Sequence, residues 1–194
     1  MEINKTILDL CGGTGAWSRL YELAGYQVYN ITLPKYDLTK EEIVQYCISL
    51  KPYGVLCAID CTIWANSGAR WFKDRKPEEV FYHAKLLVHC LRIIYESNPV
   101  FWCIENPVGK MREFLGKPRL IFDPCEFGGY LKNPDTDLYT KKTYLWGNFN
   151  IPLKKPTPPI YGSKMHKMPP SSKRAELRSI TPVGFSNAFY LYNQ

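Results

Sequence analysis

Three short segments carry the residue types that could perform chemistry, and they follow one another along the chain. A glycine-rich turn spans Asp9–Gly15, an isolated thiol stands at Cys61, and a carboxyl precedes an amide at Glu105 and Asn106. Glycine-rich turns let a backbone approach nucleotide-like ligands, thiolates are nucleophiles, and carboxyl groups in apolar settings donate protons. No one segment would justify an active site alone, but their order along the chain predicts one.

The glycine-rich turn joins a predicted strand at Lys5–Leu10 to a predicted helix at Ala16–Ala24, whose first N–H groups would be unpaired. Such a turn can hold a dinucleotide, a phosphate or S-adenosylmethionine, or it can be a tight turn with no ligand. The spacing G-G-x-G differs from G-x-G-x-x-G, and a carboxylate at Asp9 would repel a pyrophosphate but attract a cationic amino-acid group. Both details favour S-adenosylmethionine. The residues expected to bind it are Asp9, Leu10, Cys11, Gly12, Gly13, Thr14 and Gly15.

A second part of the cofactor site is expected after the predicted strand Gln27–Ile31. In nucleotide-binding folds an acidic residue at the end of this strand holds the ribose hydroxyls. The strand ends without a carboxylate, although Asn30 and Thr32 offer weaker hydrogen bonds and Asp37 follows a few residues later. We therefore expect Thr32 and Asp37 to complete the cofactor site.

The thiol and the carboxyl each follow a predicted strand, where ligand sites form in α/β proteins. A cysteine needs a positive environment to be reactive, which Arg70 would supply and Asp60 would oppose. At a hydrophobic strand end, the pKa of Glu105 would be raised and the carboxyl could donate a proton. The plainer interpretations remain an inert half-buried thiol at Cys61 and a turn-capping carboxylate at Glu105.

The elements that must position these residues alternate between strands and helices. Alternation of this kind predicts an α/β fold with a largely parallel sheet. A capping box at Thr39 and Glu42 is expected to open the second helix. The predicted strands are Lys5–Leu10, Gln27–Ile31, Gly54–Ala58 and Val100–Ile104, and the predicted helices are Ala16–Ala24, Thr39–Leu50 and Pro77–Ser97.

Length and composition fit one globular domain, because 194 residues with 45% hydrophobic and 22% charged content are typical of such proteins. Apolar stretches are too short for a transmembrane helix, and the N-terminus lacks a signal-peptide layout, so no membrane association and a cytoplasmic location are expected. Seven cysteines without a CxxC pair and three histidines predict neither disulfides nor a metal site. The net charge of +7 indicates a polyanionic partner or simply serves solubility.

Taken together, these segments resemble the carbon-5 cytosine-specific DNA methyltransferases, in particular the short Dcm-like proteins of phage and mobile elements. The resemblance extends from Ile7 to Tyr192. Asp9–Gly15 is similar to the S-adenosylmethionine loop D-L-F-x-G-x-G, although a cysteine replaces its phenylalanine. Cys61 matches the catalytic cysteine, which the family precedes with proline where this chain has aspartate. Glu105 and the asparagine after it match the Glu-Asn of the family's E-N-V motif.

Two later segments extend the resemblance. Lys141–Gly147 resembles a basic segment of the short Dcm-like proteins, and Thr181–Phe185 resembles the last motif, whose helix within 180–194 folds back beside the cofactor loop. Sequence-specific members insert a target recognition domain between these segments, whereas this chain has only a basic, Pro-rich connector at 151–174. The resemblance implies one domain, 1–194, with a Rossmann-like S-adenosylmethionine-dependent methyltransferase fold and no separate target recognition domain.

The resemblance also implies a reaction. Cys61 would add to carbon 6 of cytosine, Glu105 would protonate or hydrogen-bond ring nitrogen 3, and Asn106 would position the loop. The implied substrate is cytosine in DNA, in a bacterium or a phage-infected cell, and the implied cofactor is S-adenosylmethionine. Alternatives are the same chemistry on a free pyrimidine nucleotide and a non-catalytic DNA-binding relative, and the oligomeric state stays open. The residues expected to bind the substrate are Arg70, Lys141 and Lys142.

Overall fold

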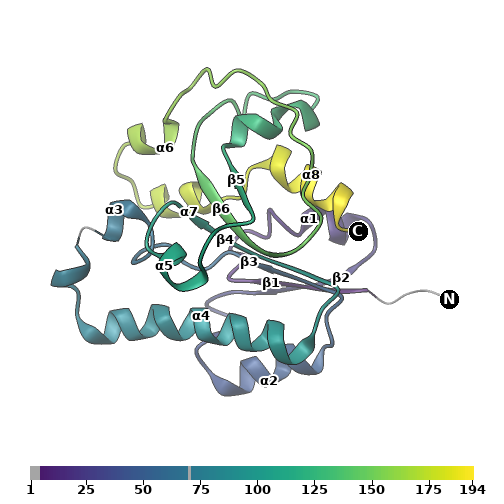
Figure 1. Cartoon of the computed structure of the whole chain (residues 1–194), viewed down its shortest axis with the longest axis vertical. Coiled ribbons are helices and arrows are strands. Elements are labelled where there is room, and N and C mark those ends of the chain that lie inside the picture. Colours follow the sequence, from purple (N-terminus) through teal and green to yellow (C-terminus); the bar gives the residue numbers. More distant parts are fainter. Residues whose placement is uncertain (1–4, 70) are drawn as a thin grey trace.

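The structure, a computed structural model, describes residues 5–69 and 71–194. The predicted substrate contact of Arg70 lies outside the described residues. Six strands form one sheet in the order β2-β1-β3-β4-β6-β5 (Figure 1). Strands β1 to β4 are parallel, and β6 runs antiparallel to both of its neighbours. The predicted α/β fold with a largely parallel sheet is therefore confirmed. The strands are β1 (Thr6–Leu10), β2 (Gln27–Ile31), β3 (Gly54–Cys57), β4 (Phe101–Pro107), β5 (Leu120–Phe122) and β6 (Thr143–Asn148).

Helices cover both faces of the sheet, so that the molecule has three layers (Figure 1). One apolar cluster lies between the sheet and the helices α2 and α4, and a second, rich in aromatic rings, lies between the sheet and α1 and α8. The central strands β1 and β3 are buried on both faces, as expected for parallel strands between two helical layers. The helices are α1 (Arg19–Leu23), α2 (Glu41–Ser49), α3 (Asn66–Ala69), α4 (Pro77–Ser97), α5 (Met111–Leu115), α6 (Lys164–Lys167), α7 (Arg174–Ser179) and α8 (Val183–Tyr192), with 3-10 helices η1 (Phe72–Asp74) and η2 (Pro124–Tyr130).

Two predicted helix starts are wrong. The first helix begins at Arg19 instead of Ala16: residues 16–18 form a turn, and the hydroxyl of Ser18, the N-cap residue, donates to Asp9 instead of accepting from the helix backbone. The helix N-terminus therefore does not follow the glycine turn directly. The predicted capping box at Thr39 is also absent, because Thr39 donates its backbone N–H and its hydroxyl to Asp37.

The C-terminal helix α8 packs on α1, which follows the glycine turn. The Trp17 ring lies 5.8 Å from Phe185 and 5.4 Å from Phe189, measured between ring centroids. The segment 151–174 is mostly exposed, but its backbone pairs with η2: the Thr157 N–H donates to the Cys125 carbonyl at 2.8 Å. Among the described residues, the helices are all too short or too polar to span a bilayer.

Candidate active site

Because of the strand order, the chain leaves two neighbouring strands in different directions at the carboxyl edge of the sheet. Strand β1 pairs with β2 on one side and with β3 on the other, so the loops that leave β1 and β3 turn toward different sides. Ligands of open α/β sheets bind at such a switch point. The glycine loop (Cys11–Gly15) follows β1, and the nucleophile loop (Ala58–Ala65) follows β3. The fold therefore brings two of the three predicted segments to the same edge of the sheet.

The glycine loop is shaped by backbone conformations that favour glycine. Gly13 and Gly15 have φ angles of 52° and 71°, in the left-handed region. The Gly15 N–H donates to the Gly12 carbonyl at 2.9 Å, and the Cys11 N–H continues the sheet by donating to the Ile31 carbonyl at 2.9 Å. Thr14 is exposed at the tip of the loop. The loop is thus a compact turn that extends the pairing of β1 with β2.

Asp9 lies directly beneath this loop and is fully buried. A Cβ atom added to Gly12 would lie 2.3 Å from the carboxyl carbon of Asp9, so only glycine fits above it. The Ser18 hydroxyl donates to Asp9 Oδ2 at 2.6 Å, whereas Oδ1 is buried without a hydrogen-bond partner among the described residues. Burial raises the pKa of Asp9 to about 6, against the lowering effect of the Ser18 hydrogen bonds. Asp9 therefore supports the loop from below as a buried carboxylate that lacks a second donor.

The end of β2 supplies Asn30 to the loop, while the predicted acid is occupied elsewhere. The Asn30 side-chain N–H donates to the Gly13 carbonyl at 3.0 Å, and its Oδ1 is buried without a partner in the described part of the chain. Thr32 is half-buried, and its carbonyl accepts from Tyr36 N–H. Asp37 accepts both donors of Thr39, which lowers the pKa of its carboxyl. Its bonds are thus local, and Asn30 is the β2 residue that contacts the loop.

The nucleophile loop is held by side-chain contacts that the sequence did not predict in detail. The carbonyl of Cys61 accepts the N–H groups of Trp64 and Ala65 at 3.1 and 2.9 Å, which makes Cys61 the first residue of a tight turn. Asp60 Oδ1 accepts the Thr62 N–H at 2.9 Å, as the side chains of turn-capping aspartates do. Asp60 therefore stabilises the turn at Cys61.

Asn106 connects this loop to β4. Its side-chain N–H donates to the Ile59 carbonyl at 2.9 Å, while the side chain is fully buried. The segment after β4 also pairs with the loop, because Lys110 N–H donates to the Trp64 carbonyl at 2.7 Å and Asn66 N–H donates to the Val108 carbonyl at 3.0 Å. The third predicted segment thus lies against the second.

Charges of both signs act on the half-buried thiol of Cys61. Burial raises its pKa, and the carboxylates of Asp60 and Glu105 raise it further, whereas Lys141 and Arg178 lower it. Burial also raises the pKa of the half-buried Glu105, and Lys141 lowers it. The thiol, the carboxyl and the lysine therefore influence one another electrostatically.

The two predicted lysines are separated by the structure. The Lys141 ammonium donates to the Arg178 carbonyl at 2.9 Å and acts on Cys61 and Glu105. Lys142 is exposed, and its charge instead lowers the pKa of Asp123, which burial raises. Neighbouring residues of an extended segment point to opposite sides, which explains the separation.

Arg178 was missed by the sequence analysis. It lies on α7, and its charge reaches Cys61 from a segment 117 positions later in the chain. One signal was available: Arg174 and Arg178 are four residues apart, which places them on one face of a helix just before the Thr181–Phe185 motif. Both are half-buried, whereas the residues between them are exposed.

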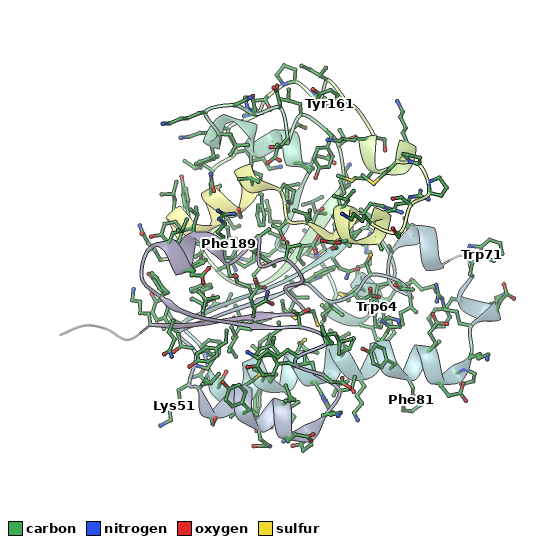
Figure 2. The ribbon with its side chains drawn as sticks, turned by 180° about the vertical axis from the view of Figure 1, so that it is seen from behind. Lys51, Trp64, Trp71, Phe81, Tyr161 and Phe189 are labelled. Carbon is green, nitrogen blue, oxygen red and sulfur yellow. The ribbon has the colours of Figure 1, made fainter. Side chains whose placement is uncertain are left out.

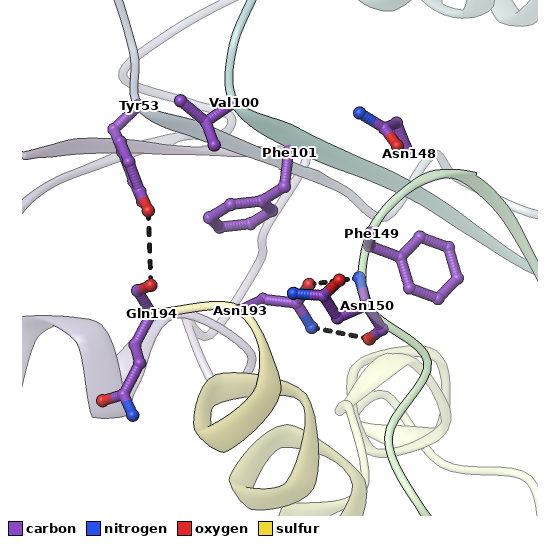
Figure 3. Close-up of a pocket in the computed structure, with 8 residues that line it drawn as sticks. All are labelled: Tyr53, Val100, Phe101, Asn148, Phe149, Asn150, Asn193 and Gln194. Carbon is purple, nitrogen blue, oxygen red and sulfur yellow. Dashed lines mark hydrogen bonds between the residues drawn. The ribbon is translucent and has the colours of Figure 1, made fainter.

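Two other features of the structure are the thiol of Cys11 and a cavity at the other edge of the sheet. The Cys11 thiol forms a hydrogen bond with Cys90, which together with burial raises the pKa of Cys11 well above its usual range and turns this thiol toward the core. A cavity of about 230 Å³ opens at the opposite edge of the sheet, where Tyr53 O–H donates to the Gln194 carbonyl (Figure 3). Within 5–69 and 71–194, no group of three histidine, cysteine or acidic side chains is arranged to hold a metal. The cavity is lined by Tyr53, Val100, Phe101, Asn148, Phe149, Asn150, Asn193 and Gln194.

Comparison with known proteins gives a distant structural likeness. The chain matches no family model and no curated protein. Among solved structures it is similar to an Escherichia coli protein encoded within a prophage and described as a candidate DNA modification methyltransferase, with 15% sequence identity and a TM-score of 0.47. The likeness covers 87% of this chain and 49% of that chain, so this chain spans about half the length of that protein.

Proposed function

We propose that this chain is an S-adenosylmethionine-dependent methyltransferase with a Rossmann-like fold that acts on carbon 5 of cytosine in DNA. The observation that carries the proposal is the shared environment of Cys61 and Glu105. A thiol and a carboxyl, whose pKa values burial raises, act on each other and are both influenced by Lys141, and the thiol follows β3, the strand that pairs with β1 before the glycine loop. Cytosine carbon-5 chemistry requires a nucleophile for carbon 6 and a proton donor for ring nitrogen 3, and these two side chains supply both.

The glycine loop fits a cofactor that carries positive charge. Asp9 Oδ1 and Asn30 Oδ1 are two buried acceptors at the loop that have no donor among the described residues. A buried carboxylate that lacks donors is costly, and a bound cationic amino or sulfonium group would offset that cost. Gly13 and Gly15 add no side chains to the loop. When bound, S-adenosylmethionine supplies an electrophilic methyl group for carbon 5.

Each side chain then has a defined task. The Cys61 thiolate forms a bond to carbon 6, and the electron pair of the carbon 5–carbon 6 double bond moves into the ring. Glu105, whose raised pKa favours the protonated form, donates a hydrogen bond to ring nitrogen 3 and so stabilises that charge. After carbon 5 is methylated, its proton passes to solvent and the carbon–sulfur bond breaks, which returns the Cys61 thiolate. Asn106 holds the loop in place through the Ile59 carbonyl.

Two alternatives each have one supporting observation. The connector 151–174 carries no separate target recognition domain, which favours the same chemistry on a free pyrimidine nucleotide. Asp60 raises the pKa of Cys61, which favours a non-catalytic relative that binds DNA. Lys141 and Arg178 act in the opposite direction on that pKa, although burial and the two carboxylates outweigh them, so the transfer assay distinguishes the catalytic proposal from the second alternative.

Calorimetric titration with S-adenosylmethionine tests the cofactor site directly. We expect micromolar binding by the wild type, loss of that binding in Asp9→Ala, and no change in the matched control Asp135→Ala, which removes an exposed carboxylate from a distant loop. Thermal unfolding of each variant shows whether it is folded. Transfer of a labelled methyl group to a cytosine oligonucleotide and to dCMP then identifies the substrate. Absence of binding up to millimolar cofactor would contradict the proposal.

A further inference from the structure

The positive charge of the chain is concentrated in one segment. Residues 141–178 contain nine lysines and arginines and one acidic residue, a net charge of +8, whereas the other 156 residues contain 16 basic and 17 acidic residues. The segment includes the residues before β6, β6 itself, the exposed connector and the helices α6 and α7. A charge concentration of this kind is the electrostatic footprint of a polyanion-binding surface.

Six of the nine cations of this segment fall into two groups. Lys154 forms an ion pair with Glu126 at 2.8 Å, and Lys155 lies 4.4 Å above the Tyr130 ring, on the side of η2. In the other group no acidic side chain of residues 5–69 and 71–194 lies within ion-pair distance. This second group consists of Lys164, Lys167, Arg174 and Arg178, and the Nε atom of Arg174 is buried without a hydrogen-bond partner among the described residues.

A hollow of about 390 Å³ is lined by two members of this second group, Lys164 and Lys167. Its walls are mostly apolar, and Tyr161 forms one of them with 45% of its surface exposed. Figure 2 places Tyr161 at the end of the molecule opposite Lys51 and Phe81. The hollow therefore combines an exposed aromatic face with two ammonium groups that form no ion pair within the described part of the chain. It is lined by Tyr161, Lys164, Lys167, Met168 and Pro169.

The backbone holds this hollow next to the proposed active site. Tyr161 N–H donates to the Leu138 carbonyl at 2.9 Å, and Thr140 N–H donates to the Gly162 carbonyl at 2.8 Å, so the two segments pair on both sides of Tyr139. The Lys164 ammonium lies 5.6 Å from the Tyr139 ring centroid and 5.5 Å from that of Tyr161. Burial and then the charges of Asp137 and Glu105 raise the pKa of Tyr139. Lys164 thus lies near Tyr161 of the hollow and near Tyr139, which precedes Lys141 by two residues.

We propose that the hollow binds an unpaired base of a single DNA strand, adjacent to the cytosine in the active site. Tyr161 would stack on the base, and Lys164 and Lys167 would contact the phosphates on either side of it, the combination that single-strand binding proteins use. A base within a duplex is already stacked and cannot enter the hollow without being extruded. The inference rests on the proposed function only for the identity of the neighbouring cytosine, because the strand contact itself requires no methyl transfer.

Fluorescence anisotropy with a labelled 12-nucleotide single strand tests this contact without cofactor. We expect tighter binding to the single strand than to the duplex of the same sequence, and about tenfold weaker binding by Tyr161→Ala, because base–aromatic stacking has this magnitude. Tyr161→Phe should bind within about twofold of the wild type. Lys164→Gln should reduce the slope of log affinity against log salt by about 0.7, the value for one phosphate of a single strand.

The matched control is Tyr95→Ala, which removes an 86% exposed tyrosine from α4, on the other face of the sheet (Figure 1). Equal binding by Tyr161→Ala and Tyr95→Ala, equal affinity for duplex and single strand, or full competition by dCMP at similar concentrations would each overturn the inference. Should Tyr161→Ala not fold, a photo-crosslink from 5-bromodeoxyuridine beside the target position to Tyr161 of the wild type decides the question. Tyr161-dependent strand binding without methyl transfer in any substrate would reject the proposed function and leave this inference in place.

Discussion

The glycine loop and the nucleophile loop leave neighbouring strands at the same edge of the sheet, yet they are stabilised in different ways. The glycine loop depends on local backbone geometry, positive φ angles at Gly13 and Gly15, and the carboxylate of Asp9 beneath it. The nucleophile loop depends on partners from later in the chain, such as Asn106 and Lys110. The first loop can form when its two strands pair, whereas the second requires most of the domain to be folded.

The two loops also differ in the charges that surround them. In the described part of the chain, the buried carboxylate of Asp9 beneath the glycine loop accepts hydrogen bonds from Ser18 but none at Oδ1, so a bound cation would compensate its charge. The thiol of Cys61 lies between two carboxylates that raise its pKa and two cations that lower it. Substitutions in the first region should therefore change stability and cofactor affinity, and substitutions in the second should change the rate of transfer.

The largest effect expected in the nucleophile region is that of Cys61→Ser. Removal of a covalent nucleophile should lower methyl transfer by at least about 10³-fold, while cofactor affinity stays within about twofold of the wild type. Transfer of a labelled methyl group and calorimetry measure the two quantities on one preparation. A variant that retains a tenth of the wild-type rate would show that Cys61 is not the nucleophile and that the two regions are not divided as described.

Asp9→Asn tests the uncompensated carboxylate of the glycine region through stability. The pKa of Asp9 is raised from 3.8 to about 6 in the folded chain, so the folded state binds the proton more tightly than the unfolded state does. The stability that this proton contributes is complete below about pH 4 and is lost as pH rises through 6. At pH 8, Asp9→Asn should therefore raise the free energy of unfolding by up to about 3 kcal/mol, and near pH 4 the difference should vanish.

Asp37→Asn is the matched comparison for this experiment, measured by urea unfolding at both pH values. Thr39 lowers the pKa of Asp37, so its charged form stabilises the folded chain above the usual pKa of an aspartate, and that stability is lost at lower pH. The asparagine should thus destabilise the chain at pH 8, opposite in sign to Asp9→Asn. The same sign in both variants would contradict the assignment of Asp9 as an uncompensated charge. Asp9→Asn should also weaken S-adenosylmethionine binding despite its greater stability.

Local patterns were sufficient for most of the fold. The predicted strand Gln27–Ile31 and the predicted helix Pro77–Ser97 match the structure in both bounds, and the other three strand predictions match to within a few residues. Physical reasons are visible in α4: Pro77 occupies the first turn, and Asn98 adopts the left-handed conformation that ends helices. The predicted start of α1 failed because the Ser18 side chain contacts Asp9, nine residues earlier, and local propensity contains no such information.

The candidate site could be predicted as a set of residue types but not as a set of contacts. Its side chains follow successive strand ends, a pattern that sequence order reveals. Arg178, the separation of Lys141 from Lys142, and the local bonding of Asp37 depend on how distant segments pack. The turn-capping role of Asp60 is an intermediate case. An aspartate two residues before the N–H that it accepts is a local pattern, which the sequence contains, whereas the charge of Asp60 alone does not indicate this role.

The smallest effect expected is also the sharpest test of the nucleophile region, because it compares adjacent residues. Lys141 lowers the pKa of Cys61, so Lys141→Gln should raise that pKa, reduce the thiolate fraction and lower the transfer rate about three- to tenfold at pH 8. Its rate–pH profile should move to higher pH, and Lys141→Arg should restore most of the rate. Lys142→Gln, whose charge acts on Asp123, should leave the profile in place. If both profiles moved together, the lysines would act through the net charge of the segment, and the separation of the two side chains would have no catalytic meaning.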